Sequence, residues 1–405
     1  MVDRDDLIRM IQKRVAAGSK IVTVEGLNGV GKTSLVNVAI FRHYKDRLQS
    51  DKGPLLIPCR NSFQLDSAEP PAKFKRRVLF EVVQTLFEQR NNLPIPSGFV
   101  RAPEKSALEA WLNSPKLDDL QAGVSILGSG MNAGKTSTTN TSTGFDESGV
   151  EKAILDWLKD VFPEKRSGGV VCTIDNIELL QTSKNARETL EVLRDTLLTL
   201  PGIRWILCGA LGIVHGVASS PRLDGYLHRP IEVRDLDHDL ASEIFETRVS
   251  ALRLRSDARL PLVSENFIEL FDIFRGNLRT VLASCDDFCL WLSEEHESPS
   301  FFDDELFPMW LKDEMFNAFD AVKSEIRPKA FEVFELACKF EVFSPSDCEE
   351  FGYKTPMALR PQIKVLEEAG LLISTQDDTD KRRKTIQVSA KGWKVAKYLE
   401  RYGNR

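Results

Sequence analysis

Short apolar runs alternate with amphipathic stretches in the first part of the chain. The runs are rich in valine, isoleucine and leucine, as in strands that are buried on both faces of a sheet. They lie at residues 21–24, 54–59, 168–174, 203–208 and 231–233. Between them, apolar residues at helical spacing predict helices at 3–17, 72–92 and 182–199, and another that starts at 35. Strands that alternate with helices predict an α/β fold, with a parallel sheet covered by helices on both faces.

The pattern changes in the second part of the chain. Helical periodicity continues to residue 295, and a polar stretch around Pro299 then indicates a linker. The last 80 or so residues predict helices and strands in the order helix–helix–helix–strand–turn–strand–helix, which is typical of a winged helix-turn-helix. We therefore expect an α/β core at 1–236, a helical lid at 237–295, a linker at 296–324 and a winged helix-turn-helix at 325–405.

Composition limits the classes of protein that fit. A chain of 405 residues, 42% hydrophobic and 28% charged, is typical of a globular protein with more than one core. The longest apolar stretch, 205–214, is too short to span a bilayer, and the charged N-terminus lacks the apolar centre of a signal peptide. The seven cysteines include no C-x-x-C pair, which favours reduced, buried thiols. We expect a cytoplasmic protein with no membrane contact.

The strongest chemical signal is a phosphate-binding loop. Gly26, four further residues and then Gly31-Lys32-Thr33 match G-x-x-x-x-G-K-[ST], between a predicted strand and a predicted helix. Glycines let the backbone turn so that its N–H groups face phosphate, and the helix N-terminus adds positive potential. We expect Lys32, as a solvated charge, to reach the β- and γ-phosphates of ATP and the Thr33 hydroxyl to ligate Mg²⁺. The expected nucleotide-binding residues are Gly26, Asn28, Gly29, Val30, Gly31, Lys32, Thr33 and Ser34.

A magnesium site of this type needs a carboxylate at the end of a neighbouring buried strand. Asp175 ends the run VVCTID and is the candidate, and Glu178 follows three residues later. A second P-loop-like segment at 129–136 has Ser129 in place of the first glycine and is followed by Thr and Asn residues that disfavour a helix. We do not expect it to bind phosphate.

With these motifs, residues 5–290 or thereabouts resemble the AAA+ ATPases, and among them the origin-recognition-type initiators, archaeal-type ATPases and STAND signalling ATPases. The resemblance implies a sensor-2 arginine on the lid, which Gly276-Asn277-Leu278-Arg279 supplies at Arg279. It also implies an arginine that reaches the γ-phosphate of a neighbouring subunit in a homo-oligomer, for which Arg222 is the candidate and Arg229 the runner-up.

The sequence departs from this family at three places, one of which is Leu278, where the sensor-2 motif usually has proline. Where the family has a polar sensor-1 residue at the end of a strand, this chain has Cys208-Gly209. Where the hydrolases place a glutamate directly after the magnesium-binding aspartate, this chain has Asn176, an amide that can position water but cannot act as a base. Glu178 is the alternative catalytic residue, and ATP binding is therefore a firmer expectation than fast hydrolysis.

A rival resemblance comes from VEGLNGVGKTS, which is similar to the P-loop of thymidylate kinase and related nucleoside monophosphate kinases. It implies a small-molecule phosphotransferase. Those enzymes also need an acceptor-binding motif soon after the P-loop, and Arg60-Asn61-Ser62 does not match it.

The C-terminal part resembles a MarR-type winged helix. Residues 381–405 carry nine Lys or Arg and one Glu, a net charge of +8, which leaves −14 for the rest of a chain whose net charge is −6. Such asymmetry indicates an anionic partner for this end. The expected DNA contacts are Lys381, Arg382, Arg383 and Lys384 on the wing, and Arg360, Gln362 and Lys364 on the third helix.

Two features of the third helix argue against DNA. Pro361 should kink it, and Glu367 and Glu368 would repel phosphate. Two function classes therefore stay open: an ATPase that couples nucleotide state to oligomerisation and DNA binding, and a STAND-type signalling or antiviral defence switch whose winged helix contacts protein and regulates the nucleotide site.

Overall fold

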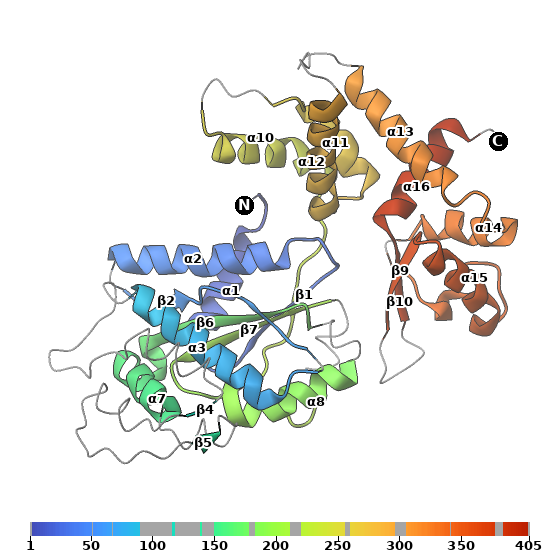
Figure 1. The fold of residues 1–405 in the computed structure, drawn as a ribbon. Helices are drawn as coiled ribbons and strands as arrows, with labels where there is room; N and C mark the ends of the chain where they lie inside the picture. Colours follow the sequence, from blue (N-terminus) through green and yellow to red (C-terminus); the bar gives the residue numbers. More distant parts are fainter. Residues whose placement is uncertain are drawn as a thin grey trace.

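The structure is a computed structural model. It describes residues 2–50, 52–66, 68–89, 116–117, 138–139, 150–177, 183–210, 220–255, 260–295, 305–340, 342–376 and 384–403. These form an α/β core, a helical lid and a C-terminal module (Figure 1).

The core contains a parallel sheet with the strand order β2-β6-β7-β1-β8, and a short strand β3 extends the pairing of β6. All five predicted strands are present. Their bounds are β1 Val22–Glu25, β2 Leu55–Pro58, β3 Phe63–Gln64, β6 Gly168–Asp175, β7 Ile203–Gly209 and β8 Ile231–Glu232. In β6 and β7 every residue is buried, which explains why these strands have no polar alternation in the sequence.

Helices cover both faces of this sheet, as the sequence predicts (Figure 1). On one face, α1 (Asp5–Ala17) and α2 (Lys32–Ser50) pack against the strands through residues such as Ile11 and Leu35. On the other face lie α3 (Pro71–Gln89), α7 (Val150–Val161), α8 (Ser183–Leu193) and a π-helical turn, Arg194–Leu198. Two short strands, β4 (Lys116–Leu117) and β5 (Thr138–Thr139), form a separate antiparallel pair.

The lid is built from α10 (Ala241–Leu252), α11 (Ser264–Ile273) and α12 (Leu278–Glu295). A fourth helix, α13 (Leu306–Asp320), lies in the segment for which the sequence predicts a linker. Its buried Phe307 and Trp310 belong to the same apolar core as Phe288 of α12. Residues 306–320 are thus a packed lid helix, because their apolar positions fill the gap beside α12.

The C-terminal module has the predicted element order, with one difference. Its elements are α14 Pro328–Ala337, a 3₁₀ turn Pro345–Asp347, α15 Pro356–Glu368, β9 Leu372–Gln376, β10 Lys384–Val388 and α16 Ala390–Tyr402. The predicted second helix at 344 is only the 3₁₀ turn, capped by the Ser344 hydroxyl. The helix α15 continues through Pro361. The wing tip, residues 377–383, lies outside the described residues.

The last helix, α16, packs on the lid and joins the two parts. Lys394 pairs with Glu314 of α13 at 2.5 Å, Arg401 pairs with Glu269 of α11 at 2.6 Å, and the rings of Tyr398 and Phe319 stack at 5.0 Å. In the part of the chain that the structure describes, no helix has both the length and the apolar character needed to cross a membrane.

Candidate functional site

The P-loop lies between the end of β1 and the start of α2, as its motif predicts. Gly29 and Gly31 have φ angles of +92° and +89°, which glycine adopts far more readily than other residues. A side chain on Gly26 would lie 2.3 Å from the carbonyl oxygen of Val233. Among the described residues, apart from Gly31 and its two chain neighbours, no atom is recorded within 4 Å of the place that a Gly31 side chain would take. The loop is therefore tightly held at its start and open at Gly31.

Lys32 differs from the expected solvated charge. Its side chain is only 6% exposed, and its ammonium group donates hydrogen bonds to the carbonyl oxygens of Gly26 and Leu27, both at 3.0 Å. A buried ammonium needs such acceptors because burial without them is costly. The Lys32 ammonium group is thus held by carbonyl oxygens of the P-loop itself.

Asp175 and Thr33 come together although 142 positions separate them. The Thr33 hydroxyl donates a 2.6 Å hydrogen bond to Asp175 Oδ2. The other oxygen, Oδ1, accepts a 3.0 Å hydrogen bond from the backbone N–H of Asn176. Asp175 ends β6, and β7 lies between β6 and β1. The carboxylate therefore reaches the P-loop helix from two strands away rather than from the adjacent strand.

These two groups fit a magnesium ion. Hydroxyl and carboxylate oxygens are ligands that Mg²⁺ prefers, and Mg²⁺ commonly uses few protein ligands together with phosphate and water. Asp175 is 7% exposed, and its carboxylate already faces the hydroxyl that the motif assigns to the metal. The donor set is suitable for Mg²⁺ bound together with a phosphate on the P-loop.

A cavity of about 260 Å³ lies between the P-loop and the lid. One wall consists of residues 28–34, with Asn176 beside it, so all of the predicted nucleotide-binding residues except Gly26 line the cavity. The opposite wall comes from the lid and the N-terminus and combines apolar side chains with three arginines. It contains Val2, Arg4, Leu236, Ile244, Thr247, Arg248, Leu278, Arg279 and Leu282. Apolar side chains together with cations suit a ligand that has a flat base and phosphates.

The lid places Arg279 in this cavity, whereas Arg222 lies elsewhere. The Arg222 side chain is 72% exposed, and its guanidinium lies 3.7 Å from Glu191 at the α8 side of the core. Glu178 lies outside the described residues. Asn176 has a left-handed backbone with φ of +53°, which asparagine tolerates better than most residues. At the sensor-1 position, β7 ends in the buried Cys208 and in Gly209, which is paired with Glu25.

Several residues that line this cavity belong to no recognisable sequence motif and are not among the predicted site residues. Arg4 is 6% exposed and donates a 2.6 Å hydrogen bond to the carbonyl oxygen of Arg234. Burial lowers its pKa, and the nearby Asp235 and Asp3 partly oppose this effect. Arg248 on α10 adds a further cation. The sequence signal that could have identified part of this wall is the helical spacing of Leu278 and Leu282, which puts them on one face of α12.

On α15 the three predicted DNA contacts do not share one face. Arg360 and Lys364 are exposed and one helical turn apart, and Lys364 lies 3.5 Å from Glu368. Gln362 is half-buried, because two residues correspond to about 200° around a helix. Of the wing residues, Lys381, Arg382 and Arg383 lie outside the described residues, and Lys384 starts β10.

The segment at 129–136, which resembles a second P-loop, also lies outside the described residues. Its predicted lack of phosphate binding therefore stays a prediction.

No protein-family model matches the chain, and no curated protein matches it. Among solved structures, it is similar to the Walker-type ATPase PABY2304 of Pyrococcus abyssi, with 12% identity, a TM-score of 0.45 and coverage of 98% of this chain and 96% of the other. It is also similar to the Aeropyrum pernix ORC1 protein, solved in complex with DNA, with 14% identity, a TM-score of 0.45 and coverage of 99% and 93%. The Aeropyrum pernix ORC2 protein, in ADPNP–ADP complexes, has 11% identity, a TM-score of 0.43 and coverage of 99% and 95%. Likeness at this level carries no conclusion about function.

Proposed function

We propose that this protein is an AAA+-like P-loop ATPase that binds Mg²⁺ and ATP between its core and its lid. The observation that carries the proposal is the hydrogen bond between Thr33 and Asp175. It brings the two halves of a magnesium–nucleotide site together from distant parts of the sequence, directly beside Lys32 and the open side of the loop. A strand–helix turn without a ligand would not need this carboxylate.

In the proposed site, each group has a separate task. Backbone N–H groups of the loop and the Lys32 ammonium bind phosphate, Thr33 and Asp175 hold the metal, and Arg279 contacts the phosphates from the lid. The metal, when bound, neutralises charge on the phosphates. Asn176, or Glu178 three residues after Asp175, orients the attacking water. Because an amide cannot take up the proton of that water, we infer that hydrolysis is slow unless Glu178 acts as the base.

The test is ATP binding by the Lys32→Ala variant, measured by calorimetry or with a fluorescent ATP analogue. Loss of the ammonium removes a charge-assisted contact worth about 1.5–3 kcal/mol, so we expect at least a roughly tenfold loss of affinity. Because Lys32 also holds the carbonyl groups of its own loop, the thermal unfolding of the variant is the control. Unchanged ATP affinity in a folded variant would remove the P-loop proposal.

At a finer level, we propose that the nucleotide state controls self-association and DNA binding. Arg222 is exposed and lies away from the cavity of its own chain, which is compatible with a contact to a neighbour. The sizing of the protein with ADP, with a slowly hydrolysed ATP analogue and without nucleotide tests this step. A strictly monomeric protein in all three conditions contradicts it.

The second function class, a regulatory C-terminal module, is favoured by one observation. The helix α16 is attached to the lid by two ion pairs and a ring stack, and the module shares a cavity with the P-loop residues Asn28 and Gly29. A module that sits this close to the nucleotide site is placed to hold the lid in one position. The two classes are separated by the DNA-binding experiment at the end of the Discussion.

A further inference from the structure

The turn between α11 and α12 connects the lid, to which it belongs, with both the P-loop and the C-terminal module. In this turn, Arg275 and Gly276 have φ angles of +51° and +77°. For an arginine this conformation is unfavourable, and such residues concentrate at functional sites. The backbone is held by hydrogen bonds from Gly276 N–H to the Phe271 carbonyl, at 2.9 Å, and from Asn277 N–H to the Phe274 carbonyl, at 3.1 Å. The turn is therefore a defined structure held by its own backbone hydrogen bonds.

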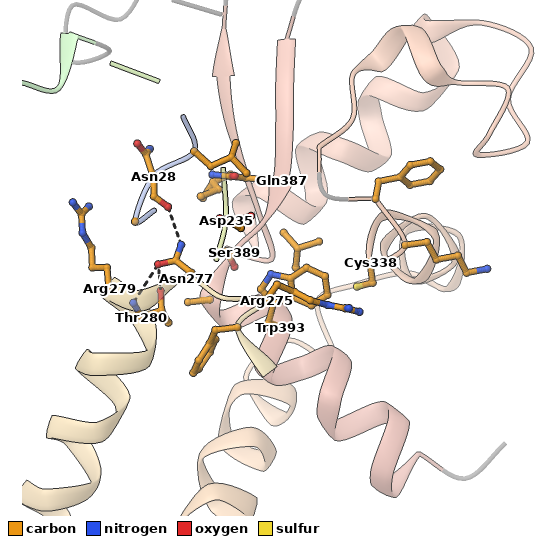
Figure 2. Close-up of a pocket in the computed structure, with 18 residues that line it drawn as sticks. Asn28, Asp235, Arg275, Asn277, Arg279, Thr280, Cys338, Gln387, Ser389 and Trp393 are labelled. Carbon is orange, nitrogen blue, oxygen red and sulfur yellow. Dashed lines mark hydrogen bonds between the residues drawn. The ribbon is translucent and has the colours of Figure 1, made fainter. Parts of the chain in front are cut away.

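Asn277 connects this turn to the P-loop. Its amide nitrogen donates a 2.8 Å hydrogen bond to the carbonyl oxygen of Asn28, and its Oδ1 accepts from the backbone N–H of Thr280 at 3.3 Å (Figure 2). A side chain on Gly29 would lie 2.1 Å from Asn277 Oδ1. The approach of the lid amide thus needs a glycine at position 29, which the phosphate-binding motif itself does not fix.

The contact sets the orientation of one peptide of the loop. In a trans peptide the carbonyl oxygen and the following N–H point in opposite directions. Because Asn277 holds the Asn28 carbonyl toward the lid, the N–H of Gly29 points away from the lid. The direction of this N–H matters, since a P-loop binds phosphate through the N–H groups of its backbone.

Arg275 connects the same turn to the C-terminal module. Its guanidinium lies 5.1 Å from the centre of the Trp393 ring of α16, within the range of a cation–π interaction. Figure 2 shows Arg275 beside Trp393, on the opposite side of the turn from Asn28. A cavity of about 560 Å³ lies between the P-loop, this turn and the module, and Cys338 is part of its wall. The cavity leaves room for these parts to move relative to one another.

We propose that Asn277 is a positioning residue for the phosphate loop, and that Arg275 transmits its position to the C-terminal module. When the lid swings, Asn277 and Arg275 move together, because only Gly276 separates them on a hydrogen-bonded turn. The orientation of the Asn28–Gly29 peptide and the position of α16 then change together. This inference rests on the proposed nucleotide site and adds the residues through which that site and the module act on each other.

The deciding variant is Asn277→Ser. Serine is a good helix N-cap and adds no charge, but it is too short to reach the Asn28 carbonyl. We expect a fluorescent ADP analogue to leave this variant about 5–10 times faster than the wild type in stopped-flow measurements, because one hydrogen bond contributes about 1 kcal/mol. The thermal unfolding midpoint should be unchanged. Thr280→Ser is the matched control: it alters the same end of α12 but keeps the hydroxyl that donates to Asn277 Oδ1 at 3.4 Å, and it should release ADP at the wild-type rate.

The link to the module is tested through the thiol of Cys338. Burial raises its pKa to about 12, and Arg275 partly opposes this effect. We expect the alkylation of Cys338, read by mass spectrometry, to be slow and to change with ADP in the wild type. In Asn277→Ser and in Arg275→Ala this dependence on ADP should be lost, whereas Arg275→Lys should keep part of it.

Two results would overturn the inference in different ways. If Lys32→Ala loses ATP but Asn277→Ser releases ADP at the wild-type rate, the nucleotide site stands and the role of Asn277 is refuted. If Asn277→Ser releases ADP faster while the ADP dependence of Cys338 alkylation persists in both variants, the link through Arg275 is refuted. A wild-type protein that binds no nucleotide refutes the proposed function and this inference with it.

Discussion

At the scale of single residues, the candidate site depends on one carboxylate with two fixed partners. Asp175 accepts hydrogen bonds from the Thr33 hydroxyl at 2.6 Å and from the Asn176 N–H at 3.0 Å. Each oxygen therefore already has a defined direction, and a metal bound beside Thr33 would find the carboxylate in place. Such preorganisation is what a binding site needs to be selective.

Asp175→Asn should separate the role in metal binding from the role in folding. Asparagine keeps the size of the side chain but lacks the negative charge, so we expect ATP affinity to fall about 10-fold or more in the presence of Mg²⁺. Without Mg²⁺ the variant and the wild type should bind ATP about equally. Titrations with Mg²⁺ and with EDTA check this prediction, and an unchanged response to Mg²⁺ would show that Asp175 is only a strand-end residue.

The residues of the site were predictable from the sequence to different degrees. Lys32 and Thr33 belong to a motif with fixed spacing, and Asp175 follows a recognisable buried strand, so local patterns identify them. Asn277 and Asn28 are 249 positions apart, and no local pattern links them. Their contact depends on how the lid folds back on the core, which is decided by tertiary packing. The burial of Lys32 has a different, local cause: its acceptors are the carbonyl groups of Gly26 and Leu27, which face it only once the loop has folded.

At the scale of elements, the strands were predictable because buried parallel strands are continuous apolar runs. Two elements depart from the sequence pattern for identifiable reasons. The helix α13 lies within the predicted linker, and its Phe307 and Trp310 are buried because they pack against Phe288 of α12. The stretch after Ser344 has the cap of a helix but forms only a 3₁₀ turn, Pro345–Asp347. Cap signals mark where a helix can start, whereas its length depends on what it packs against.

The helix α15 contains two prolines that should behave differently. Pro356 is at its first position, where proline is tolerated, but Pro361 is in its interior, where it removes a hydrogen bond to the carbonyl of Met357. Pro361 is exposed, so Pro361→Ala loses no core contact and should stabilise α15 by about 1–3 kcal/mol.

Hydrogen exchange of the peptide amides of Pro356–Glu368 measures this effect directly, because it reports the local opening of a single element. We expect slower exchange in Pro361→Ala and little change in the control Pro356→Ala. Faster exchange in Pro361→Ala would mean that the proline fits the helix without strain and that its rigidity stabilises the module.

At the scale of the whole molecule, the lid is the part that contacts both the α/β core and the C-terminal module. It contacts the P-loop through Asn277, and it carries α16 through Lys394, Arg401 and Tyr398. A change in lid position therefore reaches the C-terminal module whichever of the two function classes is correct. The classes differ only in what the module contacts through its wing, which carries Lys381, Arg382, Arg383 and Lys384.

The basic wing should decide between them. If Lys381, Arg382, Arg383 and Lys384 meet phosphates, each contact releases condensed counterions from DNA. Four contacts correspond to a slope of roughly −3.6 in a plot of log affinity against log salt for duplex DNA. The double variant Arg382→Ala, Arg383→Ala should then make this slope shallower by about 1.8 and weaken binding to all sequences alike. Arg360→Ala with Lys364→Ala is the matched control on α15, and it tests whether this helix also reads DNA.

The regulatory alternative predicts the opposite pattern for the same variants. If the wing contacts protein, the Arg382→Ala, Arg383→Ala variant should leave any weak DNA affinity unchanged but speed the release of ADP, because a contact that holds the module in place is lost. We therefore expect the Arg382→Ala, Arg383→Ala variant to change only one of two quantities: the salt-dependent DNA affinity if the wing binds DNA, or the rate of ADP release if the wing contacts protein. Since the chain outside residues 381–405 has a net charge of −14, it repels DNA at low salt, where charge acts over the longest range. DNA binding that survives loss of the wing charges would consequently have to come from Arg360 and Lys364, and the control variant would then lose it.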